Sequence, residues 1–321
     1  MITRCLKKIL FCAALLALSS SWAQTYPTHS ISLVCPFAPG GSADIMARLM
    51  ANKLGEALGV PVVVDNRPGA GGLVGASLVA KAKPDGYTLL LVTGAYPAGA
   101  ALAKQLTFDP IKDLTMVGTL TAYPFILNTT PQAPFKTVPE LIAYARANPG
   151  KLNYSSSGIG SIGHLSSELL NVMAGTEMVH IPTKGGSAAL NELLAGRIDL
   201  LFEAPTLSLP YIKSGKLHAL GSSGKERSKS WSTLPTIGEA LPGYQVYSFI
   251  GLGATAGTPD ATVKLLNQEL RKIVQQPDVI QRLVDLGGEP QASTPAEFRQ
   301  FVDQDFRKWQ QLIDLRKIER Q

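Results

Sequence analysis

The hydrophobic positions between residues 31 and 106 follow two alternating patterns. Short apolar runs rich in β-forming residues predict buried strands at 31–35, 62–65 and 87–92. Apolar positions spaced three and four residues apart predict helices at 42–58 and 73–82, and a small-residue helix follows to about 106. Three strand–helix units in succession predict a right-handed parallel sheet with helices on both faces.

This alternation breaks between residues 107 and 125, at Asp109-Pro110 and Tyr123-Pro124. We expect strands at 116–120 and 125–127, and a crossing into a second lobe near 121–123. The strand–helix theme then returns. Helices are predicted at 138–148, 165–173, 188–195 and 207–213, and strands at 152–155, 178–181, 198–202 and 217–221.

The last third of the chain predicts a return to the first lobe. A long polar loop at 222–243 precedes a strand at 245–252 that can carry the chain back, and helices follow at 259–275, 277–286 and 294–318. The predicted fold class is therefore α/β, with two lobes of mostly parallel sheet flanked by helices, a hinge and a cleft. We assign residues 24–121 and 246–321 to the first lobe and 122–245 to the second.

The N-terminal residues have the pattern of a signal peptide. Arg4, Lys7 and Lys8 precede an apolar run at 9–18, which is too short to span a bilayer, and Ser21-Trp22-Ala23 has small residues at the cleavage spacing. We predict a signal peptide at 1–23, cut after Ala23. The alternatives are a membrane anchor, which the short run disfavours, and lipidation at Cys12, although most of the apolar run follows that cysteine.

Charge and cysteine content change once this segment is removed. The full chain has 30 basic and 24 acidic residues; without Arg4, Lys7 and Lys8, 27 basic residues remain and the net charge falls from +6 to +3. No basic block remains that would indicate binding of nucleic acid. Cys35 is left as a single cysteine, so no intrachain disulfide can form, and a buried, inert thiol is the default interpretation.

Four predicted strand ends lead into glycine- or serine-rich helix starts, at 40–42, 69–72, 158–163 and 185–187. The first turn of a helix has backbone N–H groups without intrahelical partners, and the helix dipole is positive there. Ligands of open α/β sheets bind outside the carboxyl ends of the strands. If the lobes face each other, these starts can hold one carboxylate, each contributing roughly 0.3–1 kcal/mol at an exposed site.

Several side chains near these turns are candidate ligand contacts. The hydroxyls of Ser42, Ser161 and Ser187 can donate to a carboxylate. Lys184 can add a positive charge, or it is simply a solvated surface lysine. Glu203, at a strand end, can accept a hydrogen bond from a hydroxyl or ammonium group of a ligand; the alternative is a helix cap or a hinge ion pair.

Three further residues have structural alternatives of equal or greater weight. Asp44 lies in a first helical turn, where a carboxylate stabilises the dipole whatever the function, so we expect a structural role first and a ligand contact second. Tyr96 either walls the pocket or belongs to the core. His164, in a glycine-rich loop, is more often a structural hydrogen-bonding group than a catalytic base.

Enzymatic signatures are weak. The sequence has no Gly-x-Ser-x-Gly, no His-Glu-x-x-His, no paired cysteines and no phosphate-binding P-loop. The segment 158–163 matches Gly-x-Gly-x-x-Gly, but Glu177 precedes the next strand instead of ending it, and a secreted location disfavours a nicotinamide cofactor. We expect no cofactor and no metal. A secreted hydrolase or transferase, with Glu203 and His164 as acid and base, remains the alternative.

Taken together, several motifs resemble those of one family. The chain is similar to the Bug-type receptors, the extracytoplasmic solute-binding proteins of tripartite tricarboxylate transporters. The resemblance covers essentially the whole mature chain and rests on Pro36-Phe37-Ala38-Pro39-Gly40-Gly41-Ser42-Ala43-Asp44, Asn66-Arg67-Pro68-Gly69-Ala70-Gly71-Gly72, Pro84-Asp85-Gly86-Tyr87-Thr88, Phe108-Asp109-Pro110, Lys184-Gly185-Gly186, Gly196-Arg197-Ile198-Asp199 and Leu241-Pro242-Gly243-Tyr244.

The resemblance implies a type II periplasmic-binding-protein fold that closes over a small organic acid, delivery to a membrane permease, a periplasmic location and no catalysis. We expect a monomer. In the family the ligand's carboxylate lies near the first strand–helix turn and the helix starts of the second lobe. The expected ligand-binding residues are Phe37, Pro39, Gly40, Gly41, Ser42, Asp44, Thr93, Gly94, Tyr96, Ser157, Gly158, Ser161, Gly163, His164, Thr183, Lys184, Gly185, Gly186, Ser187 and Glu203.

The chain departs from the family pattern at three places. Phe202-Glu203 stands where Phe-Asp is common, Thr93-Gly94-Ala95-Tyr96 replaces a Ser/Thr-His-rich turn, and Cys35 stands where valine is common. The first two departures bear on the distal pocket, so the identity of the acid stays open. A sensor that hands its loaded form to a membrane protein other than a permease is a further alternative.

Overall fold

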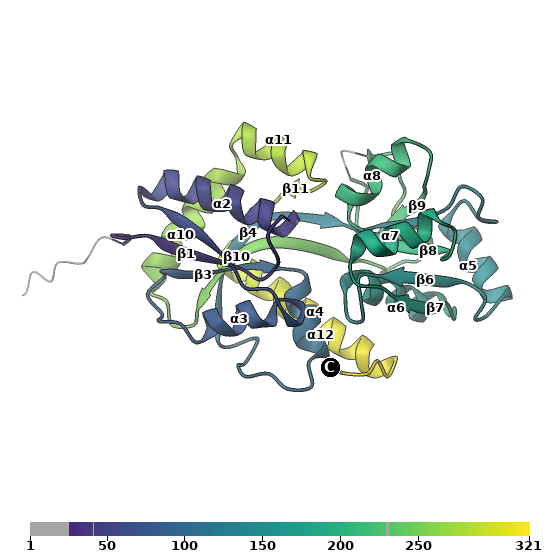
Figure 1. The fold of residues 1–321 in the computed structure, drawn as a ribbon, viewed down its shortest axis with the longest axis horizontal. Helices are drawn as coiled ribbons and strands as arrows, with labels where there is room; N and C mark the ends of the chain where they lie inside the picture. The colour runs from purple at the N-terminus through teal and green to yellow at the C-terminus, as the bar shows by residue number, and fades with distance from the viewer. Residues whose placement is uncertain (1–25, 41, 229–230) are drawn as a thin grey trace, which may run out of the picture.

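The computed structural model describes residues 26–40, 42–228 and 231–321, with Ser42 described by its backbone alone. The predicted signal peptide therefore lies outside the described residues. The chain forms two sheets, each covered by helices on both faces, that lie end to end along the molecule (Figure 1). We call each sheet with its helices a lobe. The α/β class and the two lobes predicted from the sequence are confirmed.

The first lobe is built on a six-stranded sheet. Its strand order is β11 (Glu289–Pro290), β4 (Leu114–Pro124), β10 (Tyr247–Thr255), β3 (Thr88–Thr93), β1 (Ile31–Cys35) and β2 (Val62–Asn66). The strands β1, β2 and β3 are parallel, whereas β10 runs antiparallel to both β3 and β4.

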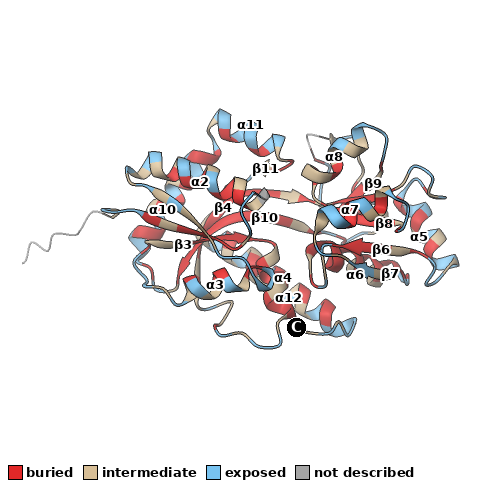
Figure 2. Cartoon of the chain, viewed as in Figure 1, coloured by how far each residue is buried: buried red, intermediate tan, exposed pale blue. Residues whose placement is uncertain are grey.

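Alternate residues of these strands supply two separate cores. On one face Leu33 packs with residues of α2 (Ser42–Leu58), α10 (Asp260–Val274) and α11 (Pro277–Asp285). On the other face Val34 packs with residues of α3 (Leu73–Ala80), α4 (Ala95–Leu102) and α12 (Pro295–Leu315). Figure 2 shows the result, with buried strands between helices whose outer sides are exposed.

The second lobe repeats this arrangement on a five-stranded sheet. Its order is β7 (Val179–Pro182), β6 (Asn153–Ser156), β8 (Leu200–Glu203), β5 (Ile126–Thr129) and β9 (His218–Ser222). One core contains residues of α5 (Val138–Ala147), α6 (Ile162–Ala174) and α9 (Ile237–Ala240); the other contains residues of α7 (Gly186–Leu194) and α8 (Pro205–Lys213).

Three segments connect the lobes. The chain passes from β4 into β5 and returns from β9 into β10, and α12 runs from the first lobe to the second (Figure 1). The C-terminal half of α12 buries Trp309, Leu312 and Ile313 in the second lobe's core, which also takes up Ala98 and Ala101 of α4. Arg316, just beyond α12, forms a 2.5 Å ion pair with the buried Glu168 of α6.

The structure differs from the sequence prediction where the chain crosses between lobes. The strand predicted at 116–120 extends over Leu114–Pro124, because it pairs along its length with β10. The sheets are mixed, since β10 and β5 enter without a crossover helix and run antiparallel to their neighbours. The loop predicted at 222–243 contains α9, which begins with a capping box between Thr236 and Glu239.

Two further observations concern single residues and helix character. Cys35 is buried in β1, and burial raises the pKa of its thiol. None of the helices in the described ranges has the length and apolar character needed to cross a bilayer.

Candidate ligand site

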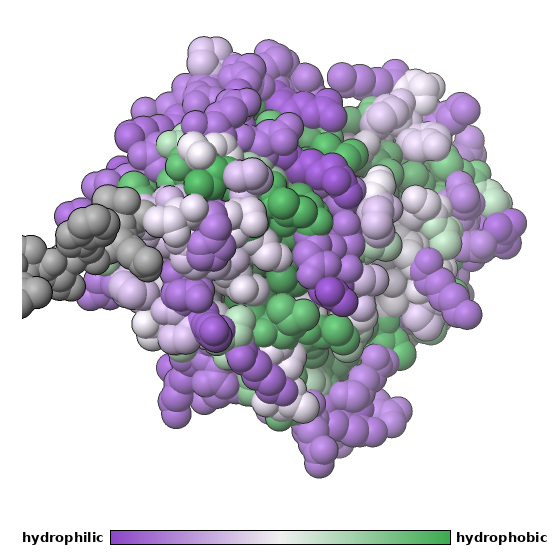
Figure 3. Space-filling model, turned by 60° about the vertical axis from the view of Figure 1, so that its left-hand side comes forward, coloured by the Kyte–Doolittle hydropathy of each residue, from purple (hydrophilic) through white to green (hydrophobic). Residues whose placement is uncertain are grey.

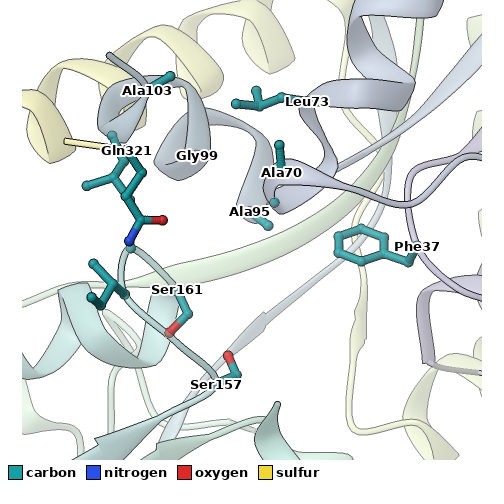
Figure 4. Close-up of a pocket in the computed structure, with 13 residues that line it drawn as sticks. Phe37, Ala70, Leu73, Ala95, Gly99, Ala103, Ser157, Ser161 and Gln321 are labelled. Atoms are coloured by element: carbon teal, nitrogen blue, oxygen red, sulfur yellow. The ribbon is translucent and has the colours of Figure 1, made fainter. Parts of the chain in front are cut away.

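A cavity of about 420 Å³ lies between the two lobes. Phe37, η1 (Ala70–Gly72) and α4 line it from the first lobe, and Ser157, Ile159, Gly160 and Ser161 line it from the second (Figure 4). Among its lining residues, all of them in the described part of the chain, no side chain is charged. A charged ligand here would therefore meet hydroxyls, the side-chain amide of Gln321 and main-chain groups.

The first lobe's side of the cavity is shaped by the turn after β1. Asp44 is buried and accepts hydrogen bonds from Gly40 N (2.9 Å), Arg48 Nε (2.9 Å) and Asn66 Nδ2 (2.9 Å). These donors, Arg48 foremost, lower the pKa of Asp44 to about 2. Asn66 also donates to Phe37 O at 3.0 Å. The carboxylate of Asp44 thus holds the turn in place, which is the structural role expected first.

The second lobe's side is the loop between β6 and α6. Ser161 caps α6 by accepting from His164 N at 3.4 Å, and its hydroxyl lies on the cavity with that of Ser157. Gly160 N donates to His164 Nδ1 at 3.0 Å. Gly163 must be a glycine, because a Cβ there would lie 2.9 Å from Phe202 O. The loop is therefore fixed by its own helix and by β8.

His164 has a structural environment. It is buried, its ring stacks on His180 with centroids 4.0 Å apart, and burial lowers its pKa to about 4. Because Nδ1 accepts from Gly160 N, the neutral imidazole carries its proton on the other nitrogen. This contact favours the structural alternative over that of an acid–base group.

The start of α7 lies beside the same loop. Thr183 donates from its hydroxyl to Ser156 O at 2.9 Å, which joins the turn after β7 to the end of β6. Glu203, at the end of β8, is buried and accepts from Ala204 N at 2.8 Å. A Cβ on Gly186 would lie 2.5 Å from Glu203 Oε2. Burial raises the pKa of Glu203 to about 7.

The structure brings only some of the expected residues to this cavity. Phe37, Ser157 and Ser161 line it. Eight expected residues are exposed or half-buried and are not part of its lining: Pro39, Gly40, Gly158, Thr183, Lys184, Gly185, Gly186 and Ser187. Buried away from its lining are Asp44, Thr93, Gly94, Tyr96, Gly163, His164 and Glu203. Gly41 and the side chain of Ser42 lie outside the described part.

Tyr96 belongs to the core and not to the cavity wall. Its ring lies in the cluster that contains Phe249 and Phe298, and its hydroxyl donates to Pro110 O at 2.6 Å. Gly94 cannot be replaced by a larger residue without a clash, because a Cβ there would lie 2.8 Å from Ser248 Oγ. The turn after β3 thus meets the cavity through Ala95 and Gly99 of α4.

Comparison with known sequences identifies the family. Residues 46–318 match the family described as "Tripartite tricarboxylate transporter family receptor". The chain belongs to this receptor family. The protein BugT of Bordetella pertussis is 34% identical over 290 residues, which cover 89% of this chain and 89% of BugT. The resemblance to Bug-type receptors noted in the sequence is confirmed.

Two solved structures resemble this receptor closely. A protein from R. palustris solved "with adipate" has 35% sequence identity and a TM-score of 0.79, covering 90% of this chain and 97% of that one. MatC from Rhodopseudomonas palustris "with bound malate" has 34% identity and a TM-score of 0.76, covering 90% of this chain and 100% of that one. Each of these two proteins was solved with a carboxylate.

Other residues that line the receptor's cavity were not among the expected ligand-binding residues. Those residues are Ala70, Gly71, Leu73, Ala95, Gly99, Leu102, Ala103, Ile159, Gly160 and Gln321. Ala70 and Gly71 belong to one of the four glycine-rich turns, and Ile159 and Gly160 belong to another, which was the available signal. Gln321 had no signal, because it reaches the cavity by folding back on α4: its N–H donates to Leu102 O at 3.1 Å.

Proposed function

We propose that this chain binds a small organic acid between its lobes and delivers it to a membrane permease. The observation that carries the proposal is the cavity between the lobes, lined from both sides by turns and helix starts and without a charged side chain among its described lining. An anion in such a place is held by main-chain N–H groups and hydroxyls, as at other helix N-termini.

The size and surface of the cavity suit a small ligand. Its volume of about 420 Å³ falls within the usual range for small-molecule sites, roughly 300–1,000 Å³. Phe37, Leu73 and Ile159 offer apolar contacts, and Ser157 and Ser161 offer hydroxyls. Figure 3 shows hydrophobic residues exposed in the middle of one face, with hydrophilic surface around them. A carboxylate with a short hydrocarbon body matches this combination.

We propose that the lobes divide at the boundaries expected from the sequence, 24–121 with 246–321 and 122–245, and that they close over the ligand. The two strand crossings supply the hinge. Because α12 packs on both lobes, closure requires its C-terminal half to move with the second lobe or to slide on α4.

Export of the chain fits this function. The N-terminal pattern of a signal peptide and membership of a transporter-receptor family support a periplasmic location and a permease partner. We propose a monomer that acts without a cofactor. Co-purification of the ligand-loaded receptor with a membrane permease would support transport, whereas capture of a signalling protein would favour the sensor alternative.

The test is a thermal-shift and calorimetric screen of the chain beginning at Gln24. The panel includes succinate, adipate, malate, aspartate and benzoate, each paired with its neutral amide. Binding to the folded state raises the melting temperature by mass action, so at least one acid is expected to stabilise the protein and its amide to have no effect. No stabilisation by any acid, or equal stabilisation by an amide, would contradict the proposal.

The same samples test the enzyme alternative. The only hydrogen bond of the His164 ring in the described residues is the one that it accepts from Gly160 N, which fixes the ring as part of the loop. We expect the bound acid to be recovered unchanged after long incubation with the protein. Product formation that is lost in His164→Ala would instead establish catalysis.

A further inference from the structure

Glu203 is an acidic side chain in a region that otherwise suits an anion. It ends β8, which is parallel to β6, and β6 is parallel to β7, so the carboxyl ends of the three strands share one edge of the second sheet. Ser157, which follows β6, lines the cavity. Gly163 of α6 and Gly186 of α7 both approach the end of β8. Two helix starts therefore flank this carboxyl group.

One carboxyl oxygen of Glu203 accepts a hydrogen bond from the described part of the protein, and the other does not. Oε1 accepts from Ala204 N at 2.8 Å. Oε2 lies against Gly186, whose missing side chain makes room for it, and no described residue donates a hydrogen bond to it. The residue as a whole is 8% exposed to solvent. Oε2 keeps some solvent access, so a ligand or a water molecule can donate a hydrogen bond to it.

The edge that carries Glu203 faces the first lobe. Glu203 pairs with Ile126 of β5, three residues after Tyr123 of β4, so it lies at the crossing between the lobes. A Cβ on Gly287, after α11, would lie 2.6 Å from Pro205 Cβ, so the first lobe also touches the start of α8. Gly163, whose Cβ would lie 2.9 Å from Phe202 O, is two residues from Ser161 of the cavity lining, so the end of β8 lies directly behind the loop that lines the cavity.

We propose that Glu203 makes this receptor select acids that carry a hydroxyl or ammonium group beside the carboxylate. An ionised carboxylate repels a second carboxylate and accepts a hydrogen bond from a hydroxyl or an ammonium group. The inference rests on the proposed function, and it adds the class of acid: 2-hydroxy and 2-amino acids in preference to their unsubstituted counterparts.

Glu203 is the group near this edge that changes charge around neutral pH. The titratable and charged groups on the elements around it are Tyr123 of β4, His164 of α6, His180 of β7 and Lys184 before α7. Burial raises the pKa of Tyr123, and His164 and His180 each have a pKa of about 4, so none of the three changes charge between about pH 6.5 and 8.5. Lys184 is exposed to solvent.

The test compares succinate, L-malate and L-aspartate, which share four carbons and differ at one position. Calorimetry is done at about pH 6.5 and 8.5, where the ligands' carboxylates are predominantly ionised. As pH rises and Glu203 ionises, the affinities for malate and aspartate relative to succinate are expected to rise, by roughly 10-fold to 100-fold for aspartate. Glu203→Gln should abolish this rise and strengthen succinate binding.

A second variant moves the carboxyl group of Glu203 without removing its charge. Gly186→Ala places a methyl group where Glu203 Oε2 lies, so the carboxyl group must move. Gly186 is not in the left-handed region, so the backbone accepts alanine. The preference for malate and aspartate over succinate should fall, with the melting temperature of the unliganded protein reporting that the fold is intact.

The outcomes separate the inference from the proposed function. Failure to bind malate and aspartate, or the same preference and pH dependence in Glu203→Gln as in the original chain, would overturn the inference. Binding of succinate or adipate in the same experiments would leave the proposed function standing. Absence of binding by every acid in the wider panel would overturn both.

Discussion

At the scale of single residues, a polar side chain in a glycine-rich turn can form its hydrogen bonds to a ligand, or it can form them within the protein and so stabilise the turn. Asp44 holds its turn: all three of its hydrogen-bond donors belong to the protein. His164 does the same for the loop before α6. Sequence patterns place both residues at the correct turn, but they do not show where the hydrogen bonds go. That depends on Asn66 and Gly160, which approach only in the folded chain.

Replacing the acceptor at Asp44 tests this structural role. Asp44→Asn removes the charge that three donors share, and should lower the free energy of unfolding at pH 7 by about 1–3 kcal/mol. The pKa of Asp44 is about 2 in the folded protein, below its usual value, so this contribution is present above about pH 4 and fades as pH falls toward 2. Denaturant titrations at pH 7 and pH 3 measure both effects.

Asp65→Asn is the matched control. Asp65 pairs with Arg67 at 3.0 Å, but both side chains are exposed, and such pairs contribute roughly 0–1 kcal/mol. Equal losses in the two variants at pH 7 would mean that Asp44 holds nothing in place.

At the scale of elements, hydrophobic periodicity predicted most strands and helices, because buried strands and amphipathic helices have different spacings of apolar positions. This prediction failed where pairing with a strand distant in the sequence determines whether a segment is a strand and how long it is. The length of β4 depends on its partner β10, and the two residues of β11 are a strand only because they pair with Ala122 and Thr121. The capping box at Thr236 was a local signal for α9 that the polar composition around it masked.

The start of α6 is the element whose stability should depend on pH. The pKa of His164 is about 4 when folded and ordinarily about 6.5, so the unfolded chain takes up more protons between these values. The free energy of unfolding should therefore fall as pH drops from 7 to 5. In His164→Gln this fall should be smaller by roughly 1–2 kcal/mol. His180, whose burial lowers its pKa to about 4, acts in the same direction in both proteins, and the raised pKa of Glu203 acts in the opposite direction in both.

Ser161→Ala is the comparison for this prediction. It removes the cap of the same helix without removing a titrating group, so it should cost about 1 kcal/mol at both pH values and keep the original slope. A fall in His164→Gln as steep as in the original chain would show that His164 is not the source of the pH dependence.

At the scale of the whole molecule, two lobes and a cavity between them follow from the order of strands and helices. A chain that leaves one sheet through β4 and returns through β10 must place the carboxyl ends of both sets of parallel strands near the crossing. The sequence predicted this arrangement. It did not predict that α12 reaches the second lobe's core. The apolar face of a long helix does not show whether that helix packs against one lobe or two.

The central claim is that an acid is held by helix starts and turns from both lobes at once. The most direct test is a crystal structure of the complex with the tightest-binding acid of the panel. We predict the ligand's carboxylate within hydrogen-bond distance of main-chain N–H groups or hydroxyls from the turn after β1 or η1 and from the loop at 157–161. A carboxylate bound to one lobe alone, or an acid seated elsewhere on the molecule, would contradict the claim.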